Sequence, residues 1–299
     1  MCLPAEMRSR LLVGAAAVLV SAAGCIEIDG SDARYIERQE KQFTVSGKPD
    51  VSVSTFDGAI EIRPWDRSEV NVVIEKRAWD KESAATIDVR TEQDANHIVV
   101  DVTVRRSEGF LHFDHRSAKL IVSMPAAANV AAKSGDGSIN IEGISGKLDL
   151  RSGDGSIRGL RLDGEVVAHS GDGSIRLEGV KGALNVDTGD GSIVAEGAFT
   201  TVRARSGDGS VRISAERGSA STGDWDISTG DGSVTVALPD GFGAEIDAHT
   251  GDGRIHMQDL TISNVTGEIA KNTVRGRLGA GGSTVRVRTG DGSITLKRS

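Results

Sequence analysis

One short phrase dominates the chain: Ser or Thr, then Gly-Asp-Gly-Ser, then Ile or Val. Five copies follow one another at a constant interval of 18 residues, with aspartates at Asp136, Asp154, Asp172, Asp190 and Asp208. Looser copies follow, with aspartates at Asp231, Asp252 and Asp291. A fixed period of this size is typical of repeat proteins, in which one small unit stacks many times.

Each 18-residue unit has two short alternating segments around the phrase. Alternation places Leu148, Leu150 and Ile157 on one face and Asp149 and Arg151 on the other. One unit cannot bury its apolar face alone, so successive units should stack in parallel at about 4.8 Å per coil. The repeat predicts an all-β fold, a parallel β-solenoid of about 18-residue coils with two short strands per coil. The pattern leaves its handedness open.

Outside the regular units the repeat is worn or interrupted. Residues 42–130 are expected to be an N-terminal degenerate β-repeat region, in which Phe56 and Ala59 replace the first Gly and the Ser of the phrase. Residues 131–299 are expected to form the regular solenoid. Within it, residues 256–283 lack the phrase and should form an irregular flap or strands along the side.

The first residues have the pattern of an export signal. Met7-Arg-Ser-Arg10 is basic, residues 11–20 are apolar, and small residues precede Cys25. The apolar run is shorter than the roughly 20 residues that span a bilayer. The stretch resembles a bacterial lipoprotein signal, which implies removal of residues 1–24, a lipid on Cys25 that binds the membrane, and a charged tether over residues 25–41. Ordinary secretion is the alternative, and either Met1 or Met7 fits as the start.

The net charge and the cysteine content restrict the classes of partner and the cellular locations that fit this chain. Without residues 1–24 the chain carries a net charge of −9, which argues against nucleic acid as a partner. The only cysteines are Cys2 and Cys25, so an exported chain has no internal disulfide. We expect a cell-envelope protein, lipid-anchored at the outer membrane or cell surface rather than free in the periplasm.

The repeated aspartates have two interpretations. Stacking would place Asp136, Asp154, Asp172, Asp190 and Asp208 about 4.8 Å apart, where like charges repel by roughly 1–3.5 kcal/mol per pair. In the first interpretation each carboxylate accepts its own Ser N–H in an Asx-turn, the glycines take positive φ, and Arg151, Arg158, Arg176, Arg205 and Arg212 balance the charge. In the second, the aspartates form a calcium ladder. We favour the structural turn and expect no cofactor.

The insert at residues 106–117 is the strongest candidate for contact with a protein or glycan ligand. It contains Phe110, Leu111, His112, Phe113 and His115 in a chain that otherwise has few aromatic residues. A metal site on its histidines would lack further ligands from a second sequence cluster.

Catalysis is not expected. The acids recur identically in each unit, as a turn requires, whereas enzymes of this architecture use unique acids and bases in a groove. The sequence therefore predicts a non-catalytic scaffold protein with a rigid binding surface, and the family resemblance described next implies an adhesin-like role. The alternative is a calcium-binding or carbohydrate-active β-helix protein.

These features together resemble the bacterial putative-adhesin domain family of β-strand-repeat envelope domains. The resemblance is carried by the Gly-Asp-Gly-Ser-Ile phrases, by Leu-Pro-Asp-Gly before Ile246, and by the closing phrase at Thr289. It covers Phe43 to Lys297. It implies a repeat fold and an envelope location, and it supplies no catalytic residues.

Overall fold

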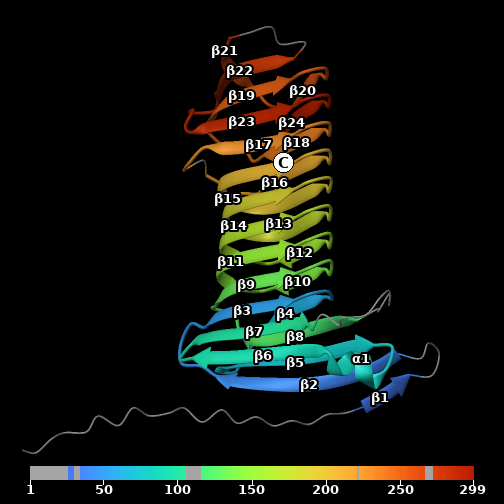
Figure 1. The fold of residues 1–299 in the computed structure, drawn as a ribbon. Helices are drawn as coiled ribbons and strands as arrows, with labels where there is room; N and C mark the ends of the chain where they lie inside the picture. The colour runs from blue at the N-terminus through green and yellow to red at the C-terminus, as the bar shows by residue number, and fades with distance from the viewer. Residues whose placement is uncertain (1–25, 30–33, 106–115, 221, 267–271) are drawn as a thin grey trace, which may run out of the picture.

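The computed structural model describes residues 26–29, 34–105, 116–220, 222–266 and 272–299. Figure 1 shows a tall column of strands standing on a wider base. Within the described residues nearly every element is a strand, and the one helix is the short α1 (Lys81–Ala85). The predicted all-β class is confirmed. In this part of the chain no helix has the length and apolar character needed to cross a membrane.

The column consists of coils whose strands pair in parallel. Ile157 lies opposite Ile139 on one side and Ile175 on the other, which is the offset of 18 residues set by the repeat. First strands, which lead into the turn phrase, form one side of the stack. They are β9 (Asn129–Ser134), β11 (Ser145–Ser152), β13 (Asp163–Ser170) and the C-terminal parts of β14 (Ile175–Thr188) and β15 (Ile193–Ser206).

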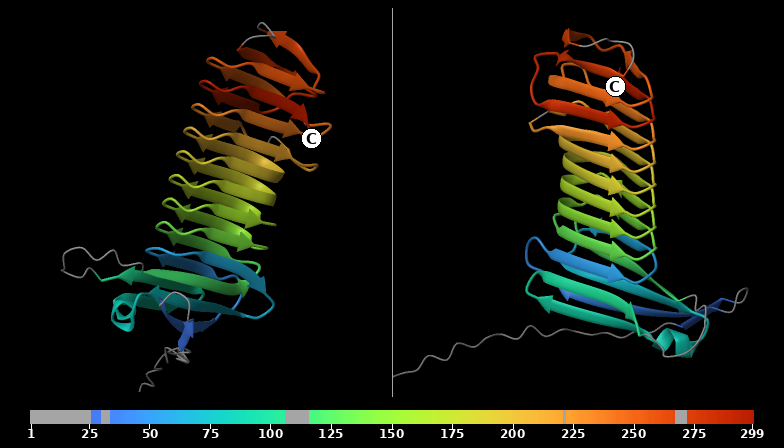
Figure 2. Two further views of the ribbon diagram at one scale, coloured as in Figure 1. Left: turned by 90° about the vertical axis from the view of Figure 1, so that its right-hand side faces the viewer. Right: turned by 45° about the horizontal axis from the view of Figure 1, so that its top comes forward.

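Second strands leave the turn phrase and form the other side of the stack. They are β10 (Ile139–Glu142), β12 (Ile157–Leu160), the N-terminal parts of β14 and β15, and β16 (Val211–Ala215). Figure 2 shows these coils from two further directions.

The core is the column of side chains between the two sides. Leu148, Leu150 and Ile157 are all fully buried, as the alternation predicts. Burying such a side chain stabilises the fold by about 1.5–3 kcal/mol. Because each coil repeats the same apolar positions, the core continues without a break along the stack.

The N-terminal base contains two further coils, whose order in space differs from their order in the chain. β3 (Asp50–Thr55) lies between β7 (His97–Val104) and β9, and β4 (Ile60–Trp65) lies between β8 (Ser117–Pro125) and β10. Antiparallel strands complete the base, since β5 (Glu69–Ala78) pairs with β8 and β6 (Ile87–Asp94) pairs with β7.

The tether prediction for residues 25–41 is wrong over most of its length. β1 (Ile26–Asp29) pairs with β2 (Arg34–Thr44), and β2 pairs antiparallel with β5. The segment is charged because one side of β2 faces solvent. Its other side is tied down by buried Phe43 and by Glu37, which forms an ion pair of 3.6 Å with the buried Lys76.

The C-terminal end also departs from chain order. The last two strands, β23 (Thr284–Thr289) and β24 (Ile294–Arg298), lie below the top coil. They separate β17 (Trp225–Thr229) and β18 (Val234–Leu238) from β19 (Ala244–Thr250) and β20 (Ile255–Gln258). Figures 1 and 2 show these dark red strands between orange ones.

Residues 256–283 contain strands that cover this end. β22 (Thr273–Leu278) pairs antiparallel with β19, and β21 (Ile262–Thr266) pairs antiparallel with β22. An antiparallel strand on the last parallel strand occupies backbone groups that another chain could otherwise pair with.

Candidate functional site

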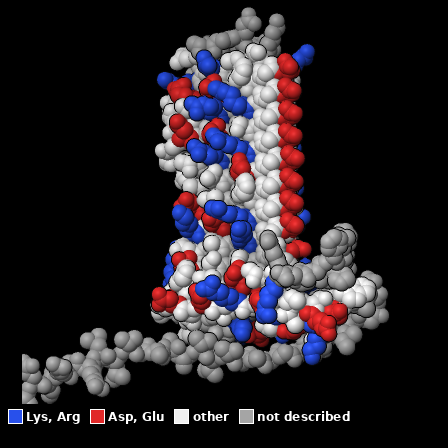
Figure 3. All heavy atoms as spheres, in the orientation of Figure 1, with Lys and Arg blue, Asp and Glu red and all other residues white. Residues whose placement is uncertain are grey.

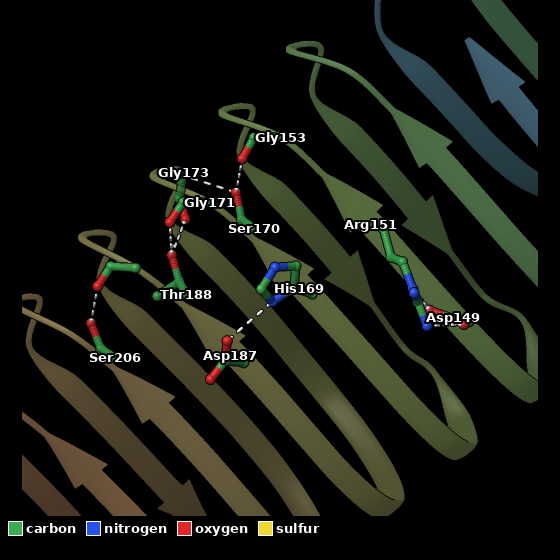
Figure 4. Close-up of polar contacts among 11 residues, drawn as sticks. Asp149, Arg151, Gly153, His169, Ser170, Gly171, Gly173, Asp187, Thr188 and Ser206 are labelled. Atoms are coloured by element: carbon green, nitrogen blue, oxygen red, sulfur yellow. Dashed lines mark hydrogen bonds and ion pairs between the residues drawn. The ribbon is translucent and has the colours of Figure 1, made fainter. Parts of the chain in front are cut away.

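The turn phrase is held by a ladder of buried hydroxyls. Ser170 Oγ donates to the carbonyl of Gly155 in the preceding coil at 2.9 Å and accepts from Gly173 N–H in its own coil at 3.1 Å. Thr188 repeats the first contact with Gly173 at 2.9 Å. Figure 4 shows the contacts of Ser170 and Thr188 with Gly173. The ladder, in spatial order, consists of Thr55, Ser134, Ser152, Ser170, Thr188, Ser206, Thr229, Thr289 and Thr250.

The predicted role of the phrase glycines is wrong. Gly173 and its counterparts do not have the positive φ expected of them. Among the described turns at this edge, only Gly58 of the degenerate phrase has a positive φ, of 131°. Glycine is required because the coils approach closely. A Cβ on Gly173 would lie 2.3 Å from the carbonyl oxygen of Gly155 and 2.5 Å from its carbon.

The phrase aspartates form a straight aspartate column along one edge of the stack. Figure 3 shows it as an unbroken acidic line. In the spatial order of the coils its members are Asp57, Asp136, Asp154, Asp172, Asp190, Asp208, Asp231, Asp291 and Asp252. Burial raises the pKa of Asp57, and the charge of Asp136 raises it further.

The predicted Asx-turn is not formed. Within the described residues Asp136, Asp154, Asp172, Asp190 and Asp208 have no side-chain hydrogen bond or ion pair, so Arg151, Arg158, Arg176, Arg205 and Arg212 form none with them. The Asp57 carboxylate of the degenerate phrase accepts from the Gly58 backbone N–H. The Ser or Thr hydroxyl holds the turn instead. Among the same residues, no three His, Cys, Asp or Glu side chains are grouped so as to hold a metal ion.

The outer face of the first strands carries matched charges. Arg151 pairs with Asp149 at 2.9 Å, Arg205 with Asp226 at 2.6 Å, and Arg288 with Asp247 at 2.5 Å. Burial alone would raise the pKa of Asp247, but hydrogen bonds from Arg288 and Arg275 lower it overall. Among the described residues Arg203 and Arg286 form no ion pair, but both lie directly opposite Asp226 on paired strands, so the arginines of this face have carboxylates as neighbours.

The outer face of the second strands is different. From β10 onward, one outward position per coil forms a row without carboxylates, here called the acid-free row. In the neighbouring coil, β4 carries Glu61 at this position. In spatial order it contains Asn140, Arg158, Arg176, Val194, Arg212, Thr235, Thr295 and His256. Among described residues neither Arg158 nor Arg212 has an ion-pair or hydrogen-bond partner.

A groove of about 390 Å³ lies at the N-terminal end of this row. Its floor includes Ile141 and Leu160, and its charged walls include Arg63, Arg158 and Arg176. Each glutamate of the groove already has a basic partner: Glu61 pairs with Lys119, Glu142 with Arg161 and Glu178 with Arg176. The groove therefore retains unpaired positive charge.

The residues that the sequence predicts for lipid attachment and ligand contact lie in other parts of the chain than this groove. Cys25, Phe110, Leu111, His112, Phe113 and His115 lie outside the described residues. Sequence analysis missed the groove, although the acid-free row could have been found by comparing outward positions between units.

The geometry defines the class of protein, an all-β repeat protein whose units pair in parallel along a column. The Toastrack DUF4097 family model matches residues 37–297, and the chain belongs to this family. The family resemblance of the repeated phrases is thereby confirmed.

Several solved structures also match over most of the chain. A putative cell adhesion protein from Clostridium sporogenes has 13% identity and a TM-score of 0.27, with 88% of this chain and 100% of that one covered. A putative adhesin from Bacteroides fragilis has 12% identity, a TM-score of 0.42 and coverages of 87% and 96%. A putative lipid binding protein from Parabacteroides distasonis has 13% identity, a TM-score of 0.28 and coverages of 87% and 96%. No curated protein matches the chain.

Proposed function

We propose that the protein is a non-catalytic, lipid-anchored component of the bacterial cell envelope. Its β-solenoid would present a rigid, adhesin-like surface to a ligand. The observation that carries this proposal is the continuous ladder of hydroxyl contacts, which ties each coil to the next from Thr55 to Thr250. A stack fixed in this way offers straight rows of side chains over many coils.

The repetition of the acidic positions supports a binding role over catalysis. General acid–base chemistry needs groups in different environments, so that one gives and another takes a proton. Here the phrase aspartates occupy equivalent, exposed positions in successive coils, apart from the partly buried Asp57. Equivalent positions favour a structural or binding role.

The wide base is the end of the column that we assign to the membrane. Cys25 directly precedes β1, which is held in the base by its pairing with β2. Trp79 follows β5 in the same base and is 65% exposed. Tryptophan is enriched at membrane–water interfaces, because its ring is apolar and its N–H is polar.

Fractionation of cells that export the full chain tests the anchor. The parent protein should sediment with membranes, whereas Cys25→Ser should move to the soluble envelope fraction with an unchanged melting temperature. The control is Ser21→Ala, which leaves the small-residue run before Cys25 intact. Membrane sedimentation of folded Cys25→Ser would contradict lipid anchoring.

Binding assays on the purified full chain test the surface. We expect saturable binding to at least one purified envelope polymer, with no change in that polymer's length or composition after prolonged incubation. Absence of binding to a panel of envelope proteins and glycans, or turnover of any member, would contradict the proposed function.

A further inference from the structure

We propose that the second-strand face binds a linear acidic polysaccharide, whose carboxylates contact the arginines of the groove and of the acid-free row. This inference rests on the proposed function, because it assigns the ligand class of the binding surface. The polymer would lie parallel to the axis of the stack, along β10, β12, the N-terminal parts of β14 and β15, and β16.

The first step is the difference in charge pairing between the two faces. Exposed Arg151 and Arg205 on the first-strand face each contact a carboxylate of the protein. Arg158 and Arg212 on the second-strand face have no such partner among the described residues. The chain has a formal net charge of −8, so this unpaired positive charge is a local exception. It fits an anionic ligand.

The second step is the close placement of two of these arginines. Arg158 and Arg176 lie directly opposite each other on paired strands. Like charges in this position destabilise a sheet. Arg176 is partly offset by Glu178 at 3.6 Å, but Arg158 is not offset by any described carboxylate. A ligand carboxylate would relieve this repulsion and accept two parallel hydrogen bonds from a guanidinium.

The third step is the shape and chemistry of the groove. It spans the coils of β4, β10, β12 and β14, so it runs along the stack. The half-buried Leu160 provides apolar surface suited to the C–H face of a sugar ring, and the Asn140 amide can donate to and accept from hydroxyls. Arg63 and Arg158 supply the charged contacts.

The row beyond the groove extends the same chemistry. Strand neighbours are about 4.8 Å apart, so the row presents side chains at short, regular intervals along a line. Thr235 and Thr295 add hydroxyls and His256 adds an imidazole, and no carboxylate interrupts the row from Asn140 onward. A linear polymer with repeated hydroxyl and carboxylate groups matches this arrangement.

Nucleic acid is the competing polyanion, and the surface suits it less well. Single-stranded nucleic acid is bound by aromatic platforms that stack with the bases, and the acid-free row has no aromatic side chain beyond His256 at its far end. Phosphate backbones also need a dense set of basic contacts. The row contains three arginines, spread over four coils.

The test uses purified full-length protein and oligogalacturonate of defined length, with binding followed by calorimetry. Arg63→Gln/Arg158→Gln should raise the Kd by roughly tenfold for each bidentate arginine–carboxylate pair that the substitutions remove. The matched control is Arg203→Gln/Arg286→Gln, which removes two exposed arginines from the first-strand face and changes the net charge equally. The control should bind within about threefold of the parent. Both variants should melt like the parent.

Several outcomes would overturn the inference. Equal loss of affinity in both double variants would mean non-specific attraction. Equal binding of fully methyl-esterified oligomer would show that carboxylates are not recognised, and tighter arginine-dependent binding of single-stranded DNA would favour nucleic acid. If neutral glycans bind and both variants retain that binding, the proposed binding function survives and the acidic ligand fails. If no envelope polymer binds at all, the proposed function fails as well.

Discussion

At the turn phrase, glycine and hydroxyl residues are required for different physical reasons. Gly173 leaves space for the carbonyl of Gly155, whereas Ser170 supplies a hydroxyl that joins two coils. The aspartate between the glycines makes no side-chain hydrogen bond or ion pair within the described residues. Packing and hydrogen bonding at the turn therefore depend on the glycine and the hydroxyl residue that flank the aspartate.

Gly173→Ala tests the close approach. We expect the free energy of unfolding to fall by about 1–3 kcal/mol or more, because the added Cβ forces two backbones apart. Urea unfolding would measure it. Ser174→Ala, an exposed change in the same turn, is the control. Parent-like stability of Gly173→Ala would show that the coils are farther apart than described.

Thr188→Val tests the hydroxyl ladder. The substitution keeps the side-chain volume but leaves the Gly173 carbonyl without its hydroxyl donor, so stability should fall by about 1–3 kcal/mol. Thr188→Ser retains the donor and should be destabilised much less. The two variants would be compared by thermal unfolding, and equal destabilisation would assign the effect to packing.

Two aspartates should respond to pH with opposite sign. The pKa of Asp57 is raised, so its ionisation destabilises the fold as pH rises through that pKa. Asp57→Asn should stabilise the protein at neutral pH, and the gain should vanish below the ordinary carboxyl pKa of about 3.9. The pKa of Asp247 is lowered, so its stabilising charge is present above the ordinary pKa and lost as pH falls through the lowered one.

Asp247→Asn should therefore destabilise the protein at neutral pH, with a smaller difference in acid. Urea unfolding of both variants over the pH range 3–7, a window chosen to bracket the ordinary carboxyl pKa of about 3.9, checks the signs. If both substitutions changed the free energy of unfolding in the same direction at neutral pH, the environments assigned to Asp57 and Asp247 would be contradicted.

At the scale of the elements, the main finding is that the terminal coils are inserted into the stack. β23 and β24 lie between coils that precede them in the chain, and β3 and β4 lie between coils that follow them. Strand pairing at both ends thus joins segments far apart in sequence. The chain end is an internal part of the column.

Deletion of residues 283–299 tests this insertion. β17 and β19 would both lose their parallel pairing with β23, so hydrogen exchange should accelerate at residues 225–229 and at residues 244–250. Deletion of Arg298 and Ser299 alone, which retains most of β24, is the control. Undiminished protection of β17 in the longer deletion would contradict the described order.

At the scale of the whole molecule, the aspartate column is a line of mutual repulsion. Adjacent exposed charges at about 4.8 Å repel by roughly 1–3.5 kcal/mol, and the core and inter-coil hydrogen bonds must offset this. The column's position at one edge separates it from the paired charges on the first-strand face. This edge of the stack is therefore acidic, whereas the first-strand face carries paired charges of both signs.

Salt should stabilise the column. Raising NaCl from about 0.01 M to 0.15 M shortens the Debye length from about 30 Å to 8 Å and weakens the repulsion. We expect the melting temperature to rise, with calcium and magnesium having equal effects at equal ionic strength. A markedly larger effect of calcium would instead support the calcium ladder of Asp136, Asp154, Asp172, Asp190 and Asp208.

The sequence by itself determined the unit of this protein. Period-two alternation and the 18-residue interval are local properties, so they predicted the strands, the buried Ile157 and the parallel offset of one coil. The tertiary structure decided the features that depend on residues far apart in sequence. These are the pairing of β2 as a strand, the position of β23 inside the stack, and the need for glycine where a carbonyl of the neighbouring coil approaches closely. The tertiary structure also decided which arginines remain unpaired, because charge pairing depends on which coils become neighbours in space.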